Sequence, residues 1–243
     1  MSMRKGLFLS LLVLSTGFAV SCAPAGPVSD EVCVDGACDE ASLNAPIGEQ
    51  PPQTPNFEDQ LSSIPVERGN YGHVDPTKIV PAKALKTALD YFQKNFDKIK
   101  NKRWMSIADM SQHSGQRRLY LIDMTSGKVV RYLVSHGKGS DTNADGWATN
   151  FSNTNGSNAT SVGFYFAAET YSGAHGLSMR LDGLSSTNSR ARERAIVVHG
   201  ASYVIERDNH AGKSLGCPAM DNGYVKAFIE KMKNGALYYI TAG

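Results

Sequence analysis

The sequence predicts a mainly β domain, a sandwich or barrel-like sheet with a peripheral helix near each end. A series of short apolar runs lies between residues 104 and 240, separated by turn residues. Only two segments of this region, residues 81–98 and 222–233, are predicted to be helical. Many short strands with few helices are typical of a sheet packed on another sheet or curled into a barrel.

The first helix is predicted over residues 81–98. Its apolar residues recur at helical spacing and form one face; they are Leu85, Leu89, Phe92 and Phe96. Pro81 suits the first helical turn, where a backbone N–H has no partner inside the helix. We expect this aromatic face to pack in the core.

Strands are predicted at residues 104–109, 119–123, 129–134, 163–168, 176–181, 195–199 and 236–240. The second and third strands are joined by Thr125-Ser126-Gly127, which predicts a hairpin. Residues 150–160 are rich in Asn, Ser and Gly, so we expect a mobile loop there.

The first 21 residues are predicted to be a signal peptide. Arg4 and Lys5 precede an apolar run, residues 7–20, that is short for a membrane span but typical of a signal-peptide core. Cys22 follows a small residue, which favours a lipoprotein lipidated on Cys22; ordinary secretion and an uncleaved anchor are the alternatives. We expect a periplasmic or cell-envelope protein, with that lipid as its membrane attachment to the outer membrane.

Residues 22–72 are predicted to be a flexible, proline-rich tether. They contain few large apolar residues, so burial cannot offset the entropy lost on ordering. Cys33 and Cys38 would close a small disulfide loop in an oxidising compartment; two unpaired thiols are the alternative. No second Cys or His pair accompanies them, so a zinc site is not expected there.

Residues 73–243 are long enough for one domain with its own core. The formal net charge of the chain is only +2 and no basic stripe is present, so nucleic acid is not an expected partner. No internal repeat, phosphate-binding loop or dinucleotide-binding fingerprint is present.

Cys217 and His199 are the candidate catalytic pair. Cys217 lies in Ser214-Leu215-Gly216-Cys217-Pro218, and His199 ends the predicted strand at 195–199 and precedes Gly200. A free thiol has a pKa of about 8.5, so a nearby histidine base would assist its ionisation. The glycine leaves room for a substrate carbonyl, whose developing charge the N–H groups of Gly216 and Cys217 would bind.

This pattern resembles the active-site signature of the L,D-transpeptidases, the YkuD-like cysteine enzymes of bacterial cell walls. The family pattern is His, a spacer and then Ser/Thr-His-Gly-Cys, and this chain has His199-Gly200 followed by Ser214-Leu215-Gly216-Cys217. Leu215 replaces a histidine, and Ala219 replaces an asparagine. Both departures fit a divergent branch of murein L,D-transpeptidase catalytic domain proteins that often read Ser-x-Gly-Cys-Pro-Ala. The resemblance covers residues 80–243.

The resemblance implies a transferase that acts on peptidoglycan stem peptides without a cofactor. Cys217 would attack a tetrapeptide stem and form a thioester, with His199 as the base and the Gly200 carbonyl orienting its ring. The acceptor would be an amine on a second stem, a protein lysine or a D-amino acid. With water as acceptor, the same residues would form an L,D-carboxypeptidase.

Other side chains are candidates for substrate contacts. Arg180 alternates with apolar residues on a predicted strand, and its guanidinium would suit a stem carboxylate; an ion pair with Asp182 or Glu193 is the alternative. His136 and His175 are each followed by glycine, and either would compensate for Leu215 or fix a loop. Ser214 matches the family motif and is assigned to substrate binding through it.

Two other classes stay open. The histidines would serve a metal-dependent peptidase, but neither an HExxH motif nor a close HxH pair is present, so no metal is expected. A catalytically silent wall-binding protein would keep the fold without a reactive thiol, and the intact pair of Cys217 and His199 is evidence against that interpretation.

Overall fold

The protein is described here over residues 64–243 by a computed structural model, and its fold is mainly β, as predicted. The elements are α2 (Ala82–Lys94), β1 (Trp104–Asp109), β2 (Leu119–Asp123), β3 (Val129–Tyr132), η2 (Lys138–Ser140), β4 (Gly163–Gly173), β5 (Gly176–Gly183), η3 (Ser186–Asn188), β6 (Val197–Gly200), β7 (Val204–Ile205), η4 (Glu206–Asp208), β8 (His210–Ala211), β9 (Ala219–Met220), α3 (Asn222–Met232) and β10 (Leu237–Thr241).

Eight of these strands form one sheet, in the order β3-β2-β1-β10-β4-β5-β6-β9. β1 pairs with β10 in parallel, as β6 does with β9, and the other neighbours are antiparallel. The chain beyond β3 then reaches the opposite edge: the Ser135 N–H donates to the Ala219 carbonyl at 3.0 Å, and the Ser214 N–H donates to the His136 carbonyl at 2.8 Å. These bonds nearly close the sheet into a barrel.

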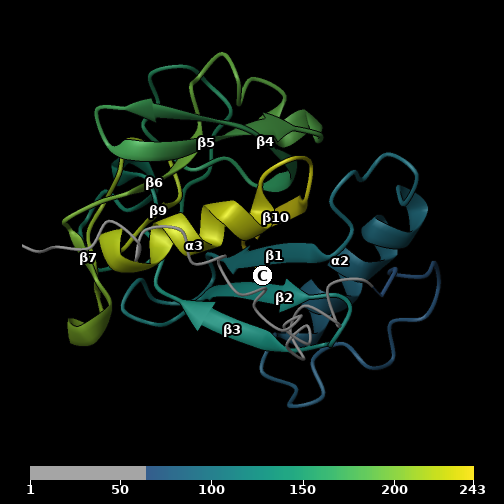
Figure 1. Cartoon of the computed structure of the whole chain (residues 1–243). Helices are drawn as coiled ribbons and strands as arrows, with labels where there is room; N and C mark the ends of the chain where they lie inside the picture. The colour runs from purple at the N-terminus through teal and green to yellow at the C-terminus, as the bar shows by residue number, and fades with distance from the viewer. Residues whose placement is uncertain (1–63) are drawn as a thin grey trace, which may run out of the picture. The chain divides into compact units, whose positions relative to one another are not determined.

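Helix α3 packs inside the curl of this sheet. Asp221 caps its first turn by accepting a hydrogen bond from the Gly223 N–H at 2.7 Å. Its buried residues belong to a core that the inner faces of the strands complete; they are Val225, Phe228, Ile229 and Met232. Figure 1 shows α3 between β4 and β5 on one side and β1, β2 and β3 on the other.

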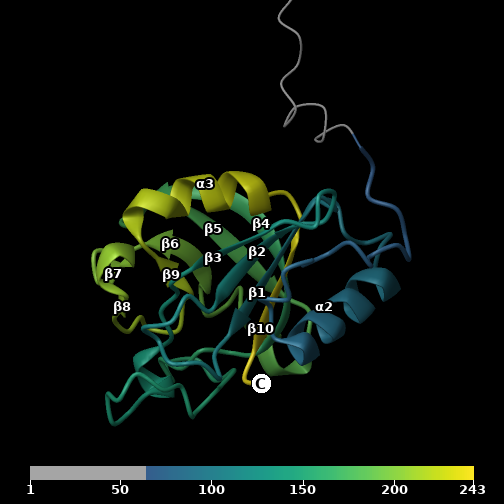
Figure 2. The ribbon, with the colours of Figure 1, turned by 90° about the horizontal axis from the view of Figure 1, so that it is seen from below.

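Helix α2 covers the outer face of the sheet. Its buried residues, Ala84, Ala88 and Phe92, pack in a second core with Met105, Ile107 and Ile122. All five residues of β2 are buried because the strand has a helix-covered face on each side. Figure 2 shows α2 and α3 lying apart on different sides of the strands. The two predicted helices are therefore the two layers that bury the sheet.

Some boundaries differ from the prediction. Helix α2 ends at Lys94 rather than at residue 98, because the Asn95 side chain donates to the Tyr91 carbonyl at 3.0 Å; Phe96 still packs edge-on against Phe92. β6 begins at Val197 rather than at 195, because Ala195 has a left-handed backbone with φ of 51°. β7, β8 and β9 have two residues each, too few to show a strand period, and were not predicted.

The segment at 150–160 is held by hydrogen bonds rather than free. The Thr160 N–H donates to the Ser140 hydroxyl at 2.9 Å, and the Thr160 hydroxyl accepts from the Gly137 N–H at 2.9 Å. Ala159 and Thr160 are buried. The expectation of a mobile loop, drawn from composition alone, missed these partners.

The predicted signal peptide, the lipidation site at Cys22 and the proposed Cys33–Cys38 disulfide lie outside the described residues. Within residues 64–243, no helix has the length and apolar character needed to span a membrane. Tyr71, in the last part of the predicted tether, packs edge-on against Phe92 at 5.6 Å between ring centroids.

Phe92 gives a test of the outer core. Replacing Phe92 with Ala removes a fully buried ring from the contact between α2 and the sheet. We expect the free energy of unfolding to fall by about 3–5 kcal/mol, measured by denaturant titration. Lys86→Ala, on the exposed face of α2, is the matched control and should change it by less than about 0.5 kcal/mol. Equal effects of the two substitutions would contradict this packing.

Candidate active site

The pairing of β6 with β9 brings Cys217 and His199 to one place. His199 is in register with Ala219, and Cys217 lies two residues before Ala219. Both side chains line a cavity of about 410 Å³. The other lining residues are Tyr171, His175, Arg194, Ala195, Val197, Tyr203, Lys213, Ser214 and Leu215. Residues from distant parts of the sequence thus share one pocket with a thiol and an imidazole.

The ring of His199 is fixed by its neighbour in sequence. Its Nδ1 lies 2.9 Å from the Gly200 carbonyl oxygen, so Nδ1 bears the proton and Nε2 is left as the basic nitrogen. Burial lowers the pKa of His199, and the charge of His175 adds to this, against the Gly200 hydrogen bond. The histidine therefore favours its neutral form, in which it can accept a proton.

His175 lies directly against His199. The two rings stack with centroids 4.3 Å apart and planes at 26°, although His175 is exposed and His199 is only 4% exposed. His175 thus lines the same cavity as Cys217 and His199.

Cys217 is partly exposed, with its sulfur 3.7 Å from the Ala195 carbonyl oxygen. Burial raises the pKa of its thiol; the Val197 N–H and the Arg194 charge oppose this shift without cancelling it. The resting pair is therefore a neutral thiol beside a neutral imidazole. Such a thiol needs a base when it attacks a carbonyl.

Residues 214–218, which contain Cys217, form the nucleophile loop, and Ser214 holds this loop by internal hydrogen bonds. Its hydroxyl donates to the Cys217 carbonyl at 2.6 Å and accepts from the Gly216 N–H at 3.1 Å. The Gly216 N–H, which we expected to face a substrate oxyanion, is thus already bonded to Ser214. The Cys217 N–H is left as the loop donor expected to face the oxyanion.

Gly216 cannot be replaced without a shift of the backbone. Its φ is +120°, in the region that favours glycine, and an added Cβ would lie 2.9 Å from the Ala159 carbonyl oxygen. Leu215, by contrast, is 64% exposed at the rim of the cavity. Of the two residues before Cys217, Gly216 is therefore fixed by its backbone conformation and its neighbours, whereas Leu215 is exposed.

His136 does not line the cavity and has a structural environment instead. It is fully buried: Arg118 donates to its Nδ1 at 2.8 Å, and its Nε2 lies 3.3 Å from a carboxylate oxygen of Asp141. The His136 carbonyl accepts the N–H of Ser214. This geometry favours the alternative in which His136 fixes a loop, because both ring nitrogens are engaged inside the protein.

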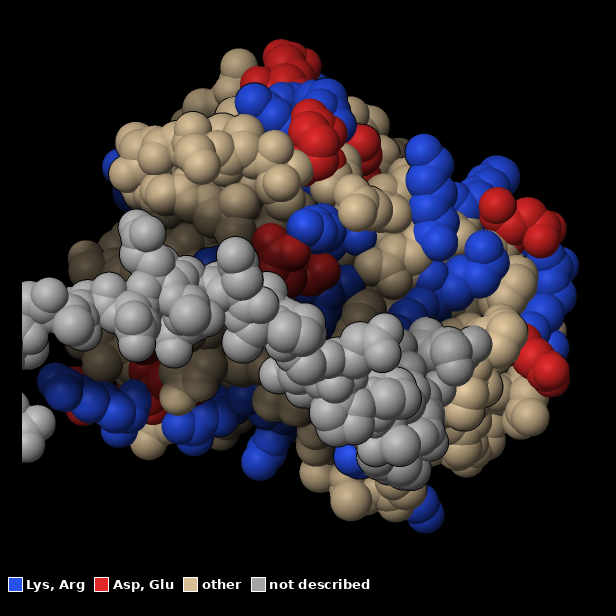
Figure 3. Space-filling view, viewed as in Figure 1, with Lys and Arg blue, Asp and Glu red and all other residues tan. Residues whose placement is uncertain are grey.

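Arg180 also lies outside the cavity lining. Its Nε is 3.3 Å from Glu169, and its guanidinium lies 4.6 Å from the ring centroid of Tyr171, which does line the cavity. The ion pair that competes with substrate binding is thus made with Glu169 rather than with Asp182 or Glu193. Acidic and basic side chains are interleaved at the top of the view in Figure 3.

Two cations of the cavity were not among the predicted site residues. Arg194 and Lys213 both line the cavity. Among residues 64–243, no Asp or Glu lines it. The signal in the sequence was their position, each directly adjacent to a segment already assigned to the site.

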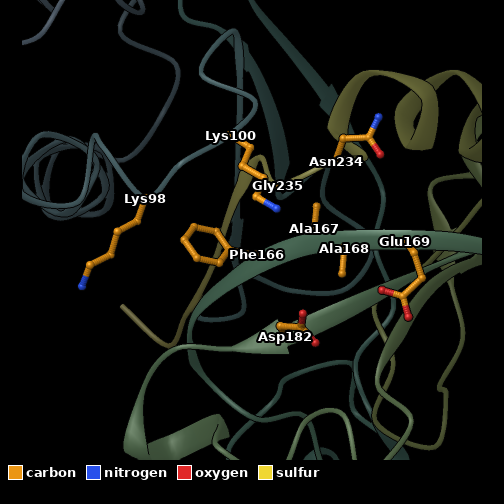
Figure 4. A pocket seen from close by; sticks show the side chains of 9 residues that line it. All are labelled: Lys98, Lys100, Phe166, Ala167, Ala168, Glu169, Asp182, Asn234 and Gly235. Atoms are coloured by element: carbon orange, nitrogen blue, oxygen red, sulfur yellow. The ribbon is translucent and has the colours of Figure 1, made fainter.

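A second cavity, of about 370 Å³, lies elsewhere (Figure 4). Lys98 and Lys100 line one part of it, and Glu169 and Asp182 another. It contains neither a thiol nor an imidazole. In the described part of the chain, no three His, Cys, Asp or Glu side chains are grouped as a metal site would require.

Comparison with known proteins assigns the family. Residues 77–241 match the model of the L,D-transpeptidase catalytic domain, and the chain belongs to this family. Comparison with curated sequences gives no match.

Solved structures of L,D-transpeptidases are similar at low identity. L,D-transpeptidase 3 from Mycobacterium tuberculosis, in complex with a faropenem-derived adduct, is 13% identical with a TM-score of 0.39, over 57% of this chain and 60% of that one. An L,D-transpeptidase from Mycobacterium smegmatis is 13% identical with a TM-score of 0.37, over 58% and 59%. One from Xylanimonas cellulosilytica is 15% identical with a TM-score of 0.35, over 57% and 60%. The chain thus spans about 60% of the length of these structures.

His136 predicts an acid limit to stability. Burial, and then the Arg118 charge, lower the pKa of His136 to about 4 from 6.5. As the pH falls below 6.5, the unfolded chain binds this proton first, so stability is full above 6.5 and is lost between about 6.5 and 4. The loss is on the order of 3 kcal/mol at 1.36 kcal/mol per pKa unit. Denaturant titrations from pH 7.5 to 4 should show a shallower decline in His136→Gln; parallel curves for parent and variant would contradict the assignment.

Proposed function

We propose that the protein is a cysteine L,D-transpeptidase of the cell envelope that acts on tetrapeptide stems of peptidoglycan. The observation that supports this most directly is the single cavity lined by Cys217 and His199, with His199 Nδ1 bonded to the Gly200 carbonyl. That bond leaves Nε2 as the proton acceptor. Membership of the family supplies the substrate class.

In the proposed reaction, Cys217 attacks the carbonyl between the third, L-centred residue of the stem and the terminal D-alanine. His199 Nε2 takes the thiol proton as the carbon–sulfur bond forms. The same nitrogen then returns this proton to the amine of the departing D-alanine as the carbon–nitrogen bond breaks. A thioester remains on Cys217. An amine of a second stem, or of another acceptor, attacks this thioester and restores the thiol.

The charges of the cavity fit a substrate with a free carboxylate. Arg194 and Lys213 line it, and the lining includes no acidic side chain. The Lys213 ammonium donates to the Asp141 carbonyl oxygen at 3.1 Å and lies 3.9 Å from its carboxylate, so donors remain for a ligand. We assign the terminal carboxylate of the donor stem to Lys213 rather than to Arg180, whose partner is Glu169.

A product assay with Cys217→Ala tests this function. Parent protein incubated with a disaccharide-tetrapeptide should yield a crosslinked dimer with loss of D-alanine, identified by mass. Cys217→Ala should form no product and should unfold at nearly the parent temperature, because the change removes only the sulfur. A tetrapeptide with a C-terminal amide should react more slowly, mainly through a higher KM.

Other outcomes identify the alternatives. A tripeptide without crosslinks would make the protein an L,D-carboxypeptidase. Activity that survives Cys217→Ala and is lost to a chelator would indicate a metal peptidase. Stem binding without turnover in the parent would indicate a silent wall-binding protein.

The role of His199 is tested without substrate. His199→Gln removes the nitrogen that takes the thiol proton, so alkylation of Cys217 by iodoacetamide near neutral pH should slow by about 10²-fold or more. The rate is followed by intact mass, with thermal unfolding as the control for folding. His175→Gln is the comparison variant, because His175 stacks on His199 but is not the histidine bonded to the Gly200 carbonyl. Unchanged alkylation in His199→Gln across the pH range would make His199 structural.

A further inference from the structure

Arg194 is a half-buried cation without an acidic partner. Its Nη1 donates to the Ser152 carbonyl at 2.6 Å, and its Nη2 donates to the Ala159 carbonyl at 2.6 Å and the Ser157 hydroxyl at 3.3 Å. All three acceptors are neutral, and no ion pair of Arg194 is found within residues 64–243.

The neighbouring arginines differ. Arg190 pairs with Glu193, and Arg192 pairs with Glu169 and Asp182. Both of these arginines are exposed. Within one short stretch of chain, therefore, the arginine that faces the cavity is the one whose charge is not compensated.

A helical turn precedes β6 and holds Arg194 at the cavity that Cys217 also lines. The Ala195 N–H donates to the Arg192 carbonyl at 3.1 Å, and the Ile196 N–H donates to the Ala191 carbonyl at 2.9 Å. With Ala195 in the left-handed region, this is the pattern that ends a helix. The same turn directs the Ala195 carbonyl to within 3.7 Å of the Cys217 sulfur.

The guanidinium also lies against the nucleophile loop. A Cβ built on Gly216 would lie 3.3 Å from Arg194 Nη2 and 2.9 Å from the Ala159 oxygen to which that nitrogen donates. Arg194 is therefore hydrogen-bonded to the segment at 152–159 and lies close to Gly216 of the loop that holds Cys217. Its hydrogen bonds fix the charge in place before any substrate arrives.

We propose that Arg194 is a positioning residue that stabilises the Cys217 thiolate during attack and holds the 152–159 segment against the nucleophile loop. An uncompensated charge at a partly buried site interacts with a nearby anion more strongly than it would in water. Burial lowers the pKa of Arg194. The charge of the Cys217 thiolate acts in the opposite direction, as expected if the two groups attract each other. The consequence for turnover rests on the proposed function; the effect on the thiol does not.

The test is the pH dependence of Cys217 alkylation by iodoacetamide, measured on the full chain by intact mass. Arg194→Met and Arg194→Gln remove the charge, and Gln keeps a donor for the Ser152 or Ala159 carbonyl. We expect both to raise the apparent pKa of the thiol by about one unit, which is about tenfold less thiolate at neutral pH. Arg194→Lys keeps the charge and should stay close to the parent. Arg190→Met, an exposed and paired arginine nearby, is the matched control and should match the parent.

An unshifted profile in a folded Arg194→Met or Arg194→Gln overturns the proposal, as does an equal shift in Arg190→Met. If neither neutral variant folds, Arg194→Lys decides: a thiol pKa raised by a full unit, despite the retained charge, contradicts stabilisation of the thiolate. Because no substrate is present, failure here is distinct from failure of the proposed function. If the parent protein makes no product, the thiol pKa can still shift in the Arg194 variants. If the parent is active, that pKa can still be the same in parent and variants.

Discussion

The closing of the sheet between the chain after β3 and the edge at β9 is the constraint on which the rest of the site depends. Residues 135 and 136 form backbone hydrogen bonds with Ala219 and Ser214, on either side of Cys217. The nucleophile loop is thus held at both ends by the backbone of the segment that follows β3. Ser214 then fixes the loop internally through its hydroxyl. A loop held in this way loses little entropy when a substrate binds, because its geometry is set on folding.

The buried group of Arg118, His136 and Asp141 supports this closure from behind. Arg118 is fully buried and donates to the Val134 carbonyl as well as to His136. Such a charge is tolerated only where each donor finds an acceptor, so the group specifies one arrangement of the chain after β3. This buried group affects the site only indirectly: the His136 carbonyl accepts the Ser214 N–H and so helps to position Ser214.

Much of the fold was predictable because strand and helix periods are local. β1 and β2 match their predicted bounds, and the Cys217 and His199 motifs were recognisable from short segments of sequence. The two-residue strand β9 was not predictable, yet its pairing with β6 brings Cys217 and His199 to the same cavity. The environments of Arg194 and His136 were not predictable either: Arg194 was not among the predicted site residues, and the choice between a substrate contact and a structural role for His136 was left open. Which arginine lacks a carboxylate, and which histidine is buried, depends on partners distant in sequence, and no periodicity encodes that.

The outward position of Leu215 has a consequence for how this family can diversify. A side chain that is 64% exposed contributes little to the core, so changing it costs little stability. Yet it lines the cavity, one residue before a glycine that cannot be replaced without a backbone shift and two before the thiol. Under the proposed function, selection can therefore vary the chemistry that an incoming peptide meets at this position while Cys217 and His199 stay unchanged. Divergence in substrate preference is expected to concentrate at such a residue.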